Sequence, residues 1–289
     1  MSKTFLITGV STGLGRAFAQ AALDAGHTVA GTVRDPGQVT GFEALAPGRA
    51  HALVLDVTDQ AAVPAAVERA ELAAGPVDVL VNNAGYGVEG TFEETPLEVF
   101  RRQFEVNVFG TIAVTQAMLP YLRQRRAGTI VFVTSMGGLR SFPGLSAYHG
   151  SKYAVEGIAD SLRQELAGFG IHVMSVEPGG FRTDWAGRSM TRVERIIGDY
   201  DELFNPLREN RLGYSGRQLG DPARAGAALL AALDSPAPPG HLLLGSDAVR
   251  LVRAARADID SEIGTWEKLS VSTDIIEPTE RETDERHED

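Results

Sequence analysis

The feature that most constrains the fold of this chain is a regular alternation of short apolar runs and longer helical stretches. The sequence predicts strands over residues 4–8, 28–33, 52–55, 77–81, 129–134 and 171–176. It predicts helices over residues 14–25, 60–73, 96–126 and 148–167. Strands that alternate with helices in this way form a parallel sheet with helices on both faces. We therefore expect a doubly wound α/β fold.

The chain changes character after the sixth predicted strand. Residues 185–217 are polar, rich in arginine and weakly patterned, and we expect them to fold over a pocket as a lid. A helix over residues 221–233, a short strand over 241–244 and a helix to about Lys268 follow, which brings the sheet to about seven strands. Residues 272–289 carry eight acids and two arginines, so we expect a disordered tail after one domain of residues 1–271.

Composition excludes several classes of protein. With 289 residues, of which 43% are hydrophobic and 22% charged, the chain can bury a large core. A net charge of −11 argues against binding to nucleic acid or to anionic membranes. The absence of cysteine excludes disulfides and thiolate metal sites, and the six scattered histidines predict no metal site. With no signal peptide and no long apolar segment, we expect a cytoplasmic protein.

A glycine-rich loop follows the first predicted strand and opens a helix. Gly9 permits a tight turn, Gly13 lets the backbone approach a pyrophosphate, and Gly15 allows close packing of helix and strand. Backbone amides at the start of the helix, together with the helix dipole, favour an anion there. The loop therefore predicts a Rossmann-type fold that binds a dinucleotide, with contacts from these glycines and from Ser11, Thr12 and Leu14.

The spacing Gly-x₃-Gly-x-Gly resembles the short-chain dehydrogenase/reductase family, in its shorter single-domain branch. Four further segments carry the resemblance: Asn82–Gly85, Ser135, Tyr148 to Lys152, and Pro178-Gly179. The later segment Leu242–Ala248 is similar to the branch of 17β-hydroxysteroid dehydrogenase type 1-like reductases. The resemblance therefore covers all of the chain except the tail.

Tyr148 and Lys152 are four residues apart, so they share one face of a helix. A phenol with a pKa near 10 is a poor base at neutral pH, and a neighbouring ammonium is expected to lower that pKa. Tyr148 then acts as proton donor in reduction and as proton acceptor in oxidation. The competing interpretation is an accidental pair on a surface helix, although the chain contains only three lysines.

The resemblance implies two further catalytic residues. Ser135, at the end of the fifth predicted strand, would hydrogen-bond the substrate oxygen and stabilise developing negative charge. Asn107 would hold a water molecule that relays protons to Lys152. A serine at a strand end is often only a turn residue, and Asn107 is alternatively a satisfied polar group that kinks a helix.

The cofactor is expected to be NADP(H). An NAD site usually places an acid at the end of the second strand, where this chain has Val33 followed by Arg34. The Arg34 guanidinium can hold a 2′-phosphate. Asp35 keeps NAD(H) open, because a shift of one or two residues would place its carboxylate on the ribose.

The resemblance implies further cofactor contacts around the same edge of the sheet. Asp56 and Val57 would lie beside the adenine, and Asn83, Ala84 and Gly85 would line the adenine-ribose side, where a competing role is to stabilise the edge of the sheet. Tyr148 and Lys152 would also contact the cofactor. Pro178, Gly179 and Thr183 match residues that contact the nicotinamide and its pyrophosphate.

The function expected from these residues is interconversion of a small-molecule carbonyl and a secondary alcohol. Apolar lid residues favour a lipophilic substrate, although they can equally pack the lid onto the domain; they are Trp185, Met190, Ile196, Ile197, Tyr200, Leu203 and Phe204. The alternatives are a non-catalytic dinucleotide sensor on the same fold, and a sugar-nucleotide epimerase, which the glycine spacing disfavours. The resemblance also implies a homodimer or homotetramer.

Overall fold

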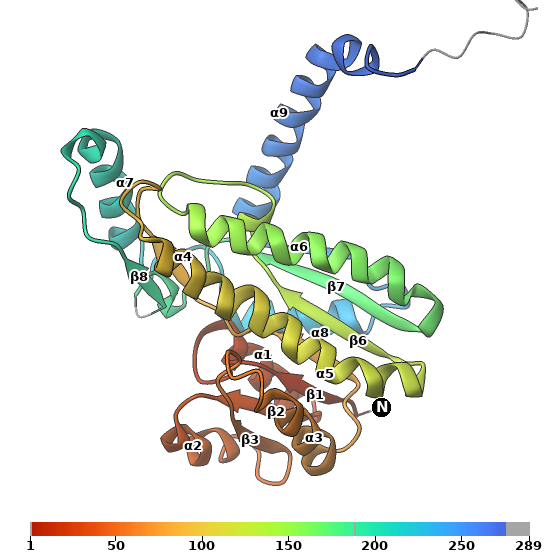
Figure 1. Cartoon of the computed structure of the whole chain (residues 1–289). Coiled ribbons are helices and arrows are strands. Elements are labelled where there is room, and N and C mark those ends of the chain that lie inside the picture. The colour runs from red at the N-terminus through yellow and green to blue at the C-terminus, as the bar shows by residue number, and fades with distance from the viewer. Residues whose placement is uncertain (1, 188, 276–289) are drawn as a thin grey trace, which may run out of the picture. The chain divides into compact units, whose positions relative to one another are not determined.

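The computed structural model describes residues 2–187 and 189–275 (Figure 1). The chain divides into two compact units, Met1–Val252 and Arg253–Asp289. The boundary that the sequence predicts at residue 271 and the role of residues 185–217 as a lid stay predictions. Most of the predicted disordered tail, residues 276–289, lies outside the described residues.

The first unit contains a seven-stranded sheet in which every neighbouring pair of strands is parallel. Its strands are β1 (Thr4–Ile7), β2 (Thr28–Val33), β3 (Ala50–Val54), β4 (Val79–Asn82), β6 (Gly128–Val133), β7 (Ile171–Pro178) and β9 (His241–Leu244). Their order is β3-β2-β1-β4-β6-β7-β9. This order confirms the predicted doubly wound, Rossmann-type parallel sheet.

Helices cover both faces of the sheet. The described residues form the helices α1 (Gly13–Asp24), α2 (Val39–Glu43), α3 (Val63–Ala74), α4 (Leu97–Phe104), α5 (Gly110–Arg125), α6 (Ser146–Leu166), α7 (Asp201–Gly213), α8 (Pro222–Leu233) and α9 (Ser246–Val271), of which α7 and α9 do not take part in the two cores described next. One core lies between the sheet and α1, α2 and α8, and the other lies under α3, α5 and α6. Figure 1 shows α4, α5 and α6 running along the second face.

Alternation along each strand explains the two cores. Phe5 and Ile7 of β1 point into the first core, and Leu6 between them points into the second. A strand that is buried on both faces is mostly apolar, which is why these strands can be recognised in the sequence as short apolar runs.

Three parts of the fold differ from the prediction. A second, two-stranded parallel sheet pairs β5 (Gly87–Glu89) with β8 (Met190–Arg192). The single helix predicted over residues 96–126 is interrupted by a π-helical turn at Glu105–Phe109. Residues 185–217, for which no regular element was predicted, contain the helix α7 as well as β8.

The second unit begins within α9. Ala248 and Val252, in the first part of this helix, are buried. From Arg253 onward the apolar side chains of Ile259, Ile263 and Trp266 are exposed. Among the described residues, no helix has both the length and the apolar character needed to cross a membrane.

Candidate active site

The predicted site residues converge at the carboxyl ends of the parallel strands. β1 pairs with β2 on one side and with β4 on the other, so the order of the strands reverses beside β1. Loops on the two sides of such a reversal separate and leave a crevice, which is where open α/β sheets bind ligands. The glycine loop after β1 and Asn83–Gly85 after β4 both lie here.

The loop after β1 is held tightly against the loop after β4. The Asn83 side-chain amide donates to the backbone carbonyls of Thr8 at 2.9 Å and Gly9 at 3.1 Å. The Thr8 hydroxyl accepts from the backbone amides of Asn83 and Ala84, both at 2.9 Å. A Cβ on Gly15 would overlap with the Asn83 amide and the Gly9 carbonyl. Asn83 therefore holds the loop, and only glycine fits at position 15.

The start of α1 has the character of an anion site. Gly9 and Gly13 have positive φ angles of 73° and 61°, which favour glycine. Thr12 occupies the N-cap position without a side-chain capping bond, and the first turn carries no acidic residue. Its amides are therefore not claimed by a side chain cap. A Cβ on Gly13 would meet only Thr183, at 3.9 Å, so this loop leaves room and the donors that a pyrophosphate needs.

The loops after β2 and β3 carry the residues predicted to select the cofactor. Asp35 is engaged in its own turn, because its carboxylate accepts from the Gly37 amide at 2.8 Å. The Asp56 carboxylate accepts from the amide and hydroxyl of Thr58 at 2.9 and 2.7 Å. Burial raises the pKa of Asp56, but these bonds and the charges of Arg102 and Arg34 outweigh burial and lower it. Asp56 and Arg34 therefore lie within electrostatic reach of each other.

Tyr148 and Lys152 lie on one face of α6, as predicted, and both are buried. The Lys152 ammonium donates to the Val133 carbonyl at 2.9 Å and lies 5.9 Å from the centre of the Tyr148 ring. A Cβ on Gly85 would lie 3.7 Å from Lys152 Nζ. The pair therefore does not lie on the exposed face of the helix, because both side chains are buried; its catalytic role stays a prediction.

The pKa of Tyr148 differs from the expectation. Burial raises the pKa of Tyr148 to about 12, against the lowering effect of its hydrogen bond with Ser135. Burial also lowers the pKa of Lys152 to about 8, against the charge of Glu156. The side chain of Tyr148 is covered by Trp185, whose ring centre lies 5.2 Å away, and by Met190. In this arrangement, exclusion of water outweighs the nearby ammonium, and Tyr148 is a neutral phenol.

Ser135 caps a short turn, and His149 fixes that turn. The Ser135 hydroxyl accepts from the Gly137 amide at 2.9 Å. His149 Nδ1 lies 2.7 Å from the Gly137 carbonyl, and its Nε2 accepts from the Phe142 amide at 2.9 Å. No role for His149 was predicted from the sequence. In the structure this buried ring ties together the loop that carries Ser135.

These two bonds require the neutral imidazole with its proton on Nδ1. Burial lowers the pKa of His149, so the unfolded chain binds a proton that the folded protein does not. We therefore expect the free energy of unfolding to fall as pH drops from 7 to 5. In the His149→Gln variant, this free energy should fall less over the same pH range. Urea unfolding at several pH values measures it. An identical slope in the variant would contradict the prediction.

Asn107 lies in the π-helical turn between α4 and α5 and is buried. Its side-chain amide donates to the Tyr86 carbonyl at 3.0 Å and to the Ser151 hydroxyl at 3.1 Å, and its oxygen accepts from the Tyr86 amide. The side chain is thus bonded to protein groups on both ends. A π-helical turn here matches the tendency of such turns to occur at functional sites. The relay of protons through a water at Asn107 stays a prediction.

The loop after β7 is held by the end of β9 and the start of α9. Pro178 ends β7, and the Gly179 amide donates to the Leu244 carbonyl at 2.8 Å. The Asp247 carboxylate accepts from the Gly180 amide at 2.8 Å. A Cβ on Gly179 would overlap with this carboxylate. Asp247 was not predicted as a site residue, and it fixes the loop that presents Pro178 and Gly179 to the crevice.

The apolar residues predicted to form a wall do not lie together. Trp185 and Met190 pack on Tyr148 together with Leu145 and Phe142. Phe204 is buried instead beneath Arg195 and Arg208, whose guanidinium carbons lie 4.8 and 5.4 Å from its ring centre. Ile196 and Leu203 are exposed. Of these, only Trp185 and Met190 lie against the predicted catalytic tyrosine.

Two buried carboxylates anchor residues 190–213. Glu89 accepts from Arg208 Nε at 2.8 Å, with Arg192 and Arg211 each 3.8 Å away. Glu94 accepts from Arg195 Nε at 2.9 Å and from the backbone amides of Ile196 and Ile197 at 2.7 Å. Burial opposes ionisation of Glu94, yet its hydrogen bonds and Arg195 lower its pKa to about 2. Ion pairs with Glu89 and Glu94 therefore hold residues 190–213 in place, where apolar packing is sparse.

Comparison with known proteins identifies the family. A family model described as short chain dehydrogenase matches residues 3–193. The chain is 39% identical over 274 residues to the protein named Oxidoreductase BOA17 of Botryotinia fuckeliana, covering 94% of this chain and 100% of that one. It is 37% identical over 209 residues to an NADPH-dependent 3-dehydrocapnine reductase of Ornithobacterium rhinotracheale, covering 70% and 74% of the two chains.

A solved structure shares the fold. The crystal structure of a short-chain dehydrogenase from Streptomyces avermitilis superimposes with a TM-score of 0.88 and 42% sequence identity, over 94% of this chain and 98% of that one. The family model, the relatives and the solved structure thus agree on one family: this chain belongs to the short-chain dehydrogenase family, and it is an oxidoreductase that acts on carbonyl or alcohol groups.

Proposed function

We propose that this oxidoreductase reduces a lipophilic ketone with NADPH, and that Ser135, Tyr148 and Lys152 are its catalytic residues. The observation that carries the proposal is the burial of Tyr148 and Lys152 together at the crevice, next to a loop whose amides suit a pyrophosphate. NADPH, when bound, supplies the hydride.

The remaining roles belong to side chains of this protein. The Ser135 hydroxyl hydrogen-bonds the substrate oxygen and Tyr148 Oη gives it a proton, which its neutral state, with a pKa of about 12, permits. The Lys152 ammonium stabilises the phenolate that is left. Trp185 and Met190 exclude water from Tyr148, so that opening of residues 185–217 admits the substrate.

The residues around the ribose support NADP(H) over NAD(H). Val33, at the position where an NAD site has an acid, is apolar and buried, and the Asp35 carboxylate points into its own turn, where its Oδ1 accepts from the Gly37 amide. Arg34 is exposed and available to a 2′-phosphate. The NADPH-dependent relative named above supports the same choice. The apolar cover of Tyr148 and that relative, a reductase of 3-dehydrocapnine, support a lipophilic ketone.

We expect the Arg34→Ala variant to lower kcat/KM for NADPH by about 10- to 100-fold and to leave NADH turnover nearly unchanged, because one charge-assisted contact contributes about 1.5–3 kcal/mol. Initial rates with both cofactors and a panel of ketones, aldehydes and quinones measure this. The control is Arg224→Ala, which removes a fully exposed guanidinium on α8. Equal or better turnover of the unmodified protein with NADH would contradict the cofactor choice.

The expected homo-oligomeric state and cytoplasmic location stay predictions. A sensor without catalytic activity is disfavoured, because a binding protein does not need a buried serine, tyrosine and lysine at one point of the crevice.

A further inference from the structure

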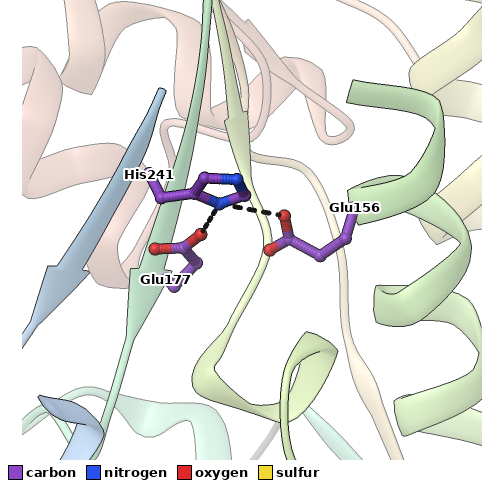
Figure 2. Close-up of side chains that lie close together, drawn as sticks. All are labelled: Glu156, Glu177 and His241. Atoms are coloured by element: carbon purple, nitrogen blue, oxygen red, sulfur yellow. Dashed lines mark hydrogen bonds and ion pairs between the residues drawn. The ribbon is translucent and has the colours of Figure 1, made fainter. Parts of the chain in front are cut away.

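A group of charged side chains lies directly behind Lys152. Glu156 of α6, Glu177 of β7 and His241 of β9 meet there, as Figure 2 shows, and we call them the acid–histidine cluster. His241 Nδ1 lies 2.6 Å from Glu177 Oε1 and 3.8 Å from Glu156 Oε2. Both glutamates are buried, whereas His241 is about one-third exposed. Neither the sequence pattern nor the proposed reaction uses these three residues.

Glu156 connects this cluster to the proposed catalytic residues. It lies one helical turn after Lys152 and two turns after Tyr148, so all three point to the same side of α6. Its Oε1 accepts from the hydroxyl of Thr134, the residue before Ser135. The Lys152 ammonium donates to the carbonyl of Val133, the residue before that. Glu156 and Lys152 thus bind two adjacent residues, Thr134 and Val133, at the end of the strand that precedes Ser135.

The charge of Glu156 acts on Lys152 as well. Lys152 is buried, and its nearest carboxylate on the same face is Glu156. Burial lowers the pKa of Lys152 to about 8, and the Glu156 carboxylate opposes that change. Without this carboxylate, a larger fraction of Lys152 would be uncharged at neutral pH, and an uncharged amine does not stabilise a phenolate.

The groups that face Glu156 decide whether it keeps its charge. Burial raises the pKa of Glu156, the bonds from Thr134 and Ser175 lower it, His241 lowers it and Asp160 raises it. Glu177 is the remaining acid within 4.8 Å. His241 Nε2 lies 3.3 Å from Asp160 Oδ1, and Arg163 donates to Asp160 at 2.7 Å. His241 therefore lies among three carboxylates, at the exposed end of the cluster.

We propose that Glu156 is a positioning residue for this reductase: its carboxylate keeps Lys152 protonated and fixes Thr134, and through it Ser135, while His241, itself oriented by Glu177, holds Glu156 in place. This inference rests on the proposed function, since it assigns Lys152 and Ser135 their catalytic roles. It adds a group that touches neither substrate nor cofactor.

The Glu156→Gln variant tests the charge separately from the shape, since glutamine keeps the size of the side chain and an oxygen for the Thr134 hydroxyl. We expect the titration of Lys152 to move to lower pH by about one unit, because an opposite charge nearby favours the charged form. The alkaline limb of the kcat profile should move down with it, while KM changes less than twofold. Glu156→Asp, which keeps the charge, should restore most of the titration.

The titration is measurable without substrate or cofactor. The chain has only three lysines, so NMR of protein with ¹³Cε-labelled lysine gives three signals, and Lys3→Arg and Lys268→Arg variants assign them. The matched control is Glu165→Gln, the same substitution at an exposed position of the same helix, for which we expect no change in either measurement.

Three results would overturn the inference. The first is an unchanged Lys152 titration in Glu156→Gln, even with lower activity, because that would leave Glu156 a purely structural role. The second is a shifted titration with an unmoved kcat profile, which would also count against Lys152 in the proposed function. The third is stoichiometric binding of Zn²⁺ that His241→Ala abolishes, since the cluster would then be a cation site and its charge would be neutralised.

Discussion

The Tyr148→Phe variant is expected to lose about 10²- to 10⁴-fold in kcat, because phenylalanine has no proton to give to the substrate oxygen. The affinity for NADPH should change little, since the loop after β1 and the start of α1 are untouched. Stopped-flow measurement of hydride transfer and fluorescence titration of NADPH separate the two quantities. The variant also removes a buried hydroxyl that bonds Ser135, so its thermal unfolding is compared as well.

Tyr153→Phe is the matched control for this prediction. Tyr153 lies on the same helix, α6, and is 43% exposed, so the same loss of a hydroxyl there should leave kcat unchanged. Comparable activity in Tyr148→Phe and the unmodified protein would remove Tyr148 from the reaction.

The Gly15→Ala variant is expected to weaken NADPH binding by about 10- to 100-fold, the equivalent of 1–3 kcal/mol for forcing a methyl group into filled space. The new methyl group would overlap with the Asn83 amide and with the Gly9 carbonyl, and the latter is backbone that cannot rotate away. The loop after β1 must therefore move, and its backbone amides no longer point toward the pyrophosphate. Isothermal titration of NADPH measures the change.

Gly157→Ala provides the control for a glycine in a helix. Gly157 lies in the middle of α6, and a Cβ there would meet no other atom within 4 Å. Alanine at this position should raise the free energy of unfolding by about 0.5–1 kcal/mol and leave NADPH binding unchanged. Unchanged NADPH affinity in Gly15→Ala would mean that the loop does not hold the cofactor.

The strands of the main sheet were predictable because each contains a short run of apolar residues and ends at a turn. The small sheet was not, since β5 and β8 have three residues each and pair across about one hundred residues of chain. Helix α7 was not predicted either. It contains Pro206, and its place depends on the bond from Arg208 to the buried Glu89, which no local pattern reveals.

The chemistry of the site was predictable where spacing along one element carries it, as for Tyr148 and Lys152. It was not predictable where distant segments meet. His149 matters through Gly137 and Phe142, and Asp247 matters through Gly180. The direction of the pKa of Tyr148 also escaped prediction, because it depends on how much water Trp185 and Met190 exclude.

The bonds from Leu244 and Asp247 to the loop after β7 have a consequence for biosynthesis. The glycine loop after β1 is translated within the first fifteen residues. The loop after β7, at Gly179 and Gly180, is held by Leu244 and Asp247, which are translated about 65 positions later than Gly179 and Gly180. A nascent chain on the ribosome can therefore form β1 to β7 before the loop after β7 is fixed. We therefore expect the loop after β7 to become rigid only when Asp247 has emerged from the exit tunnel.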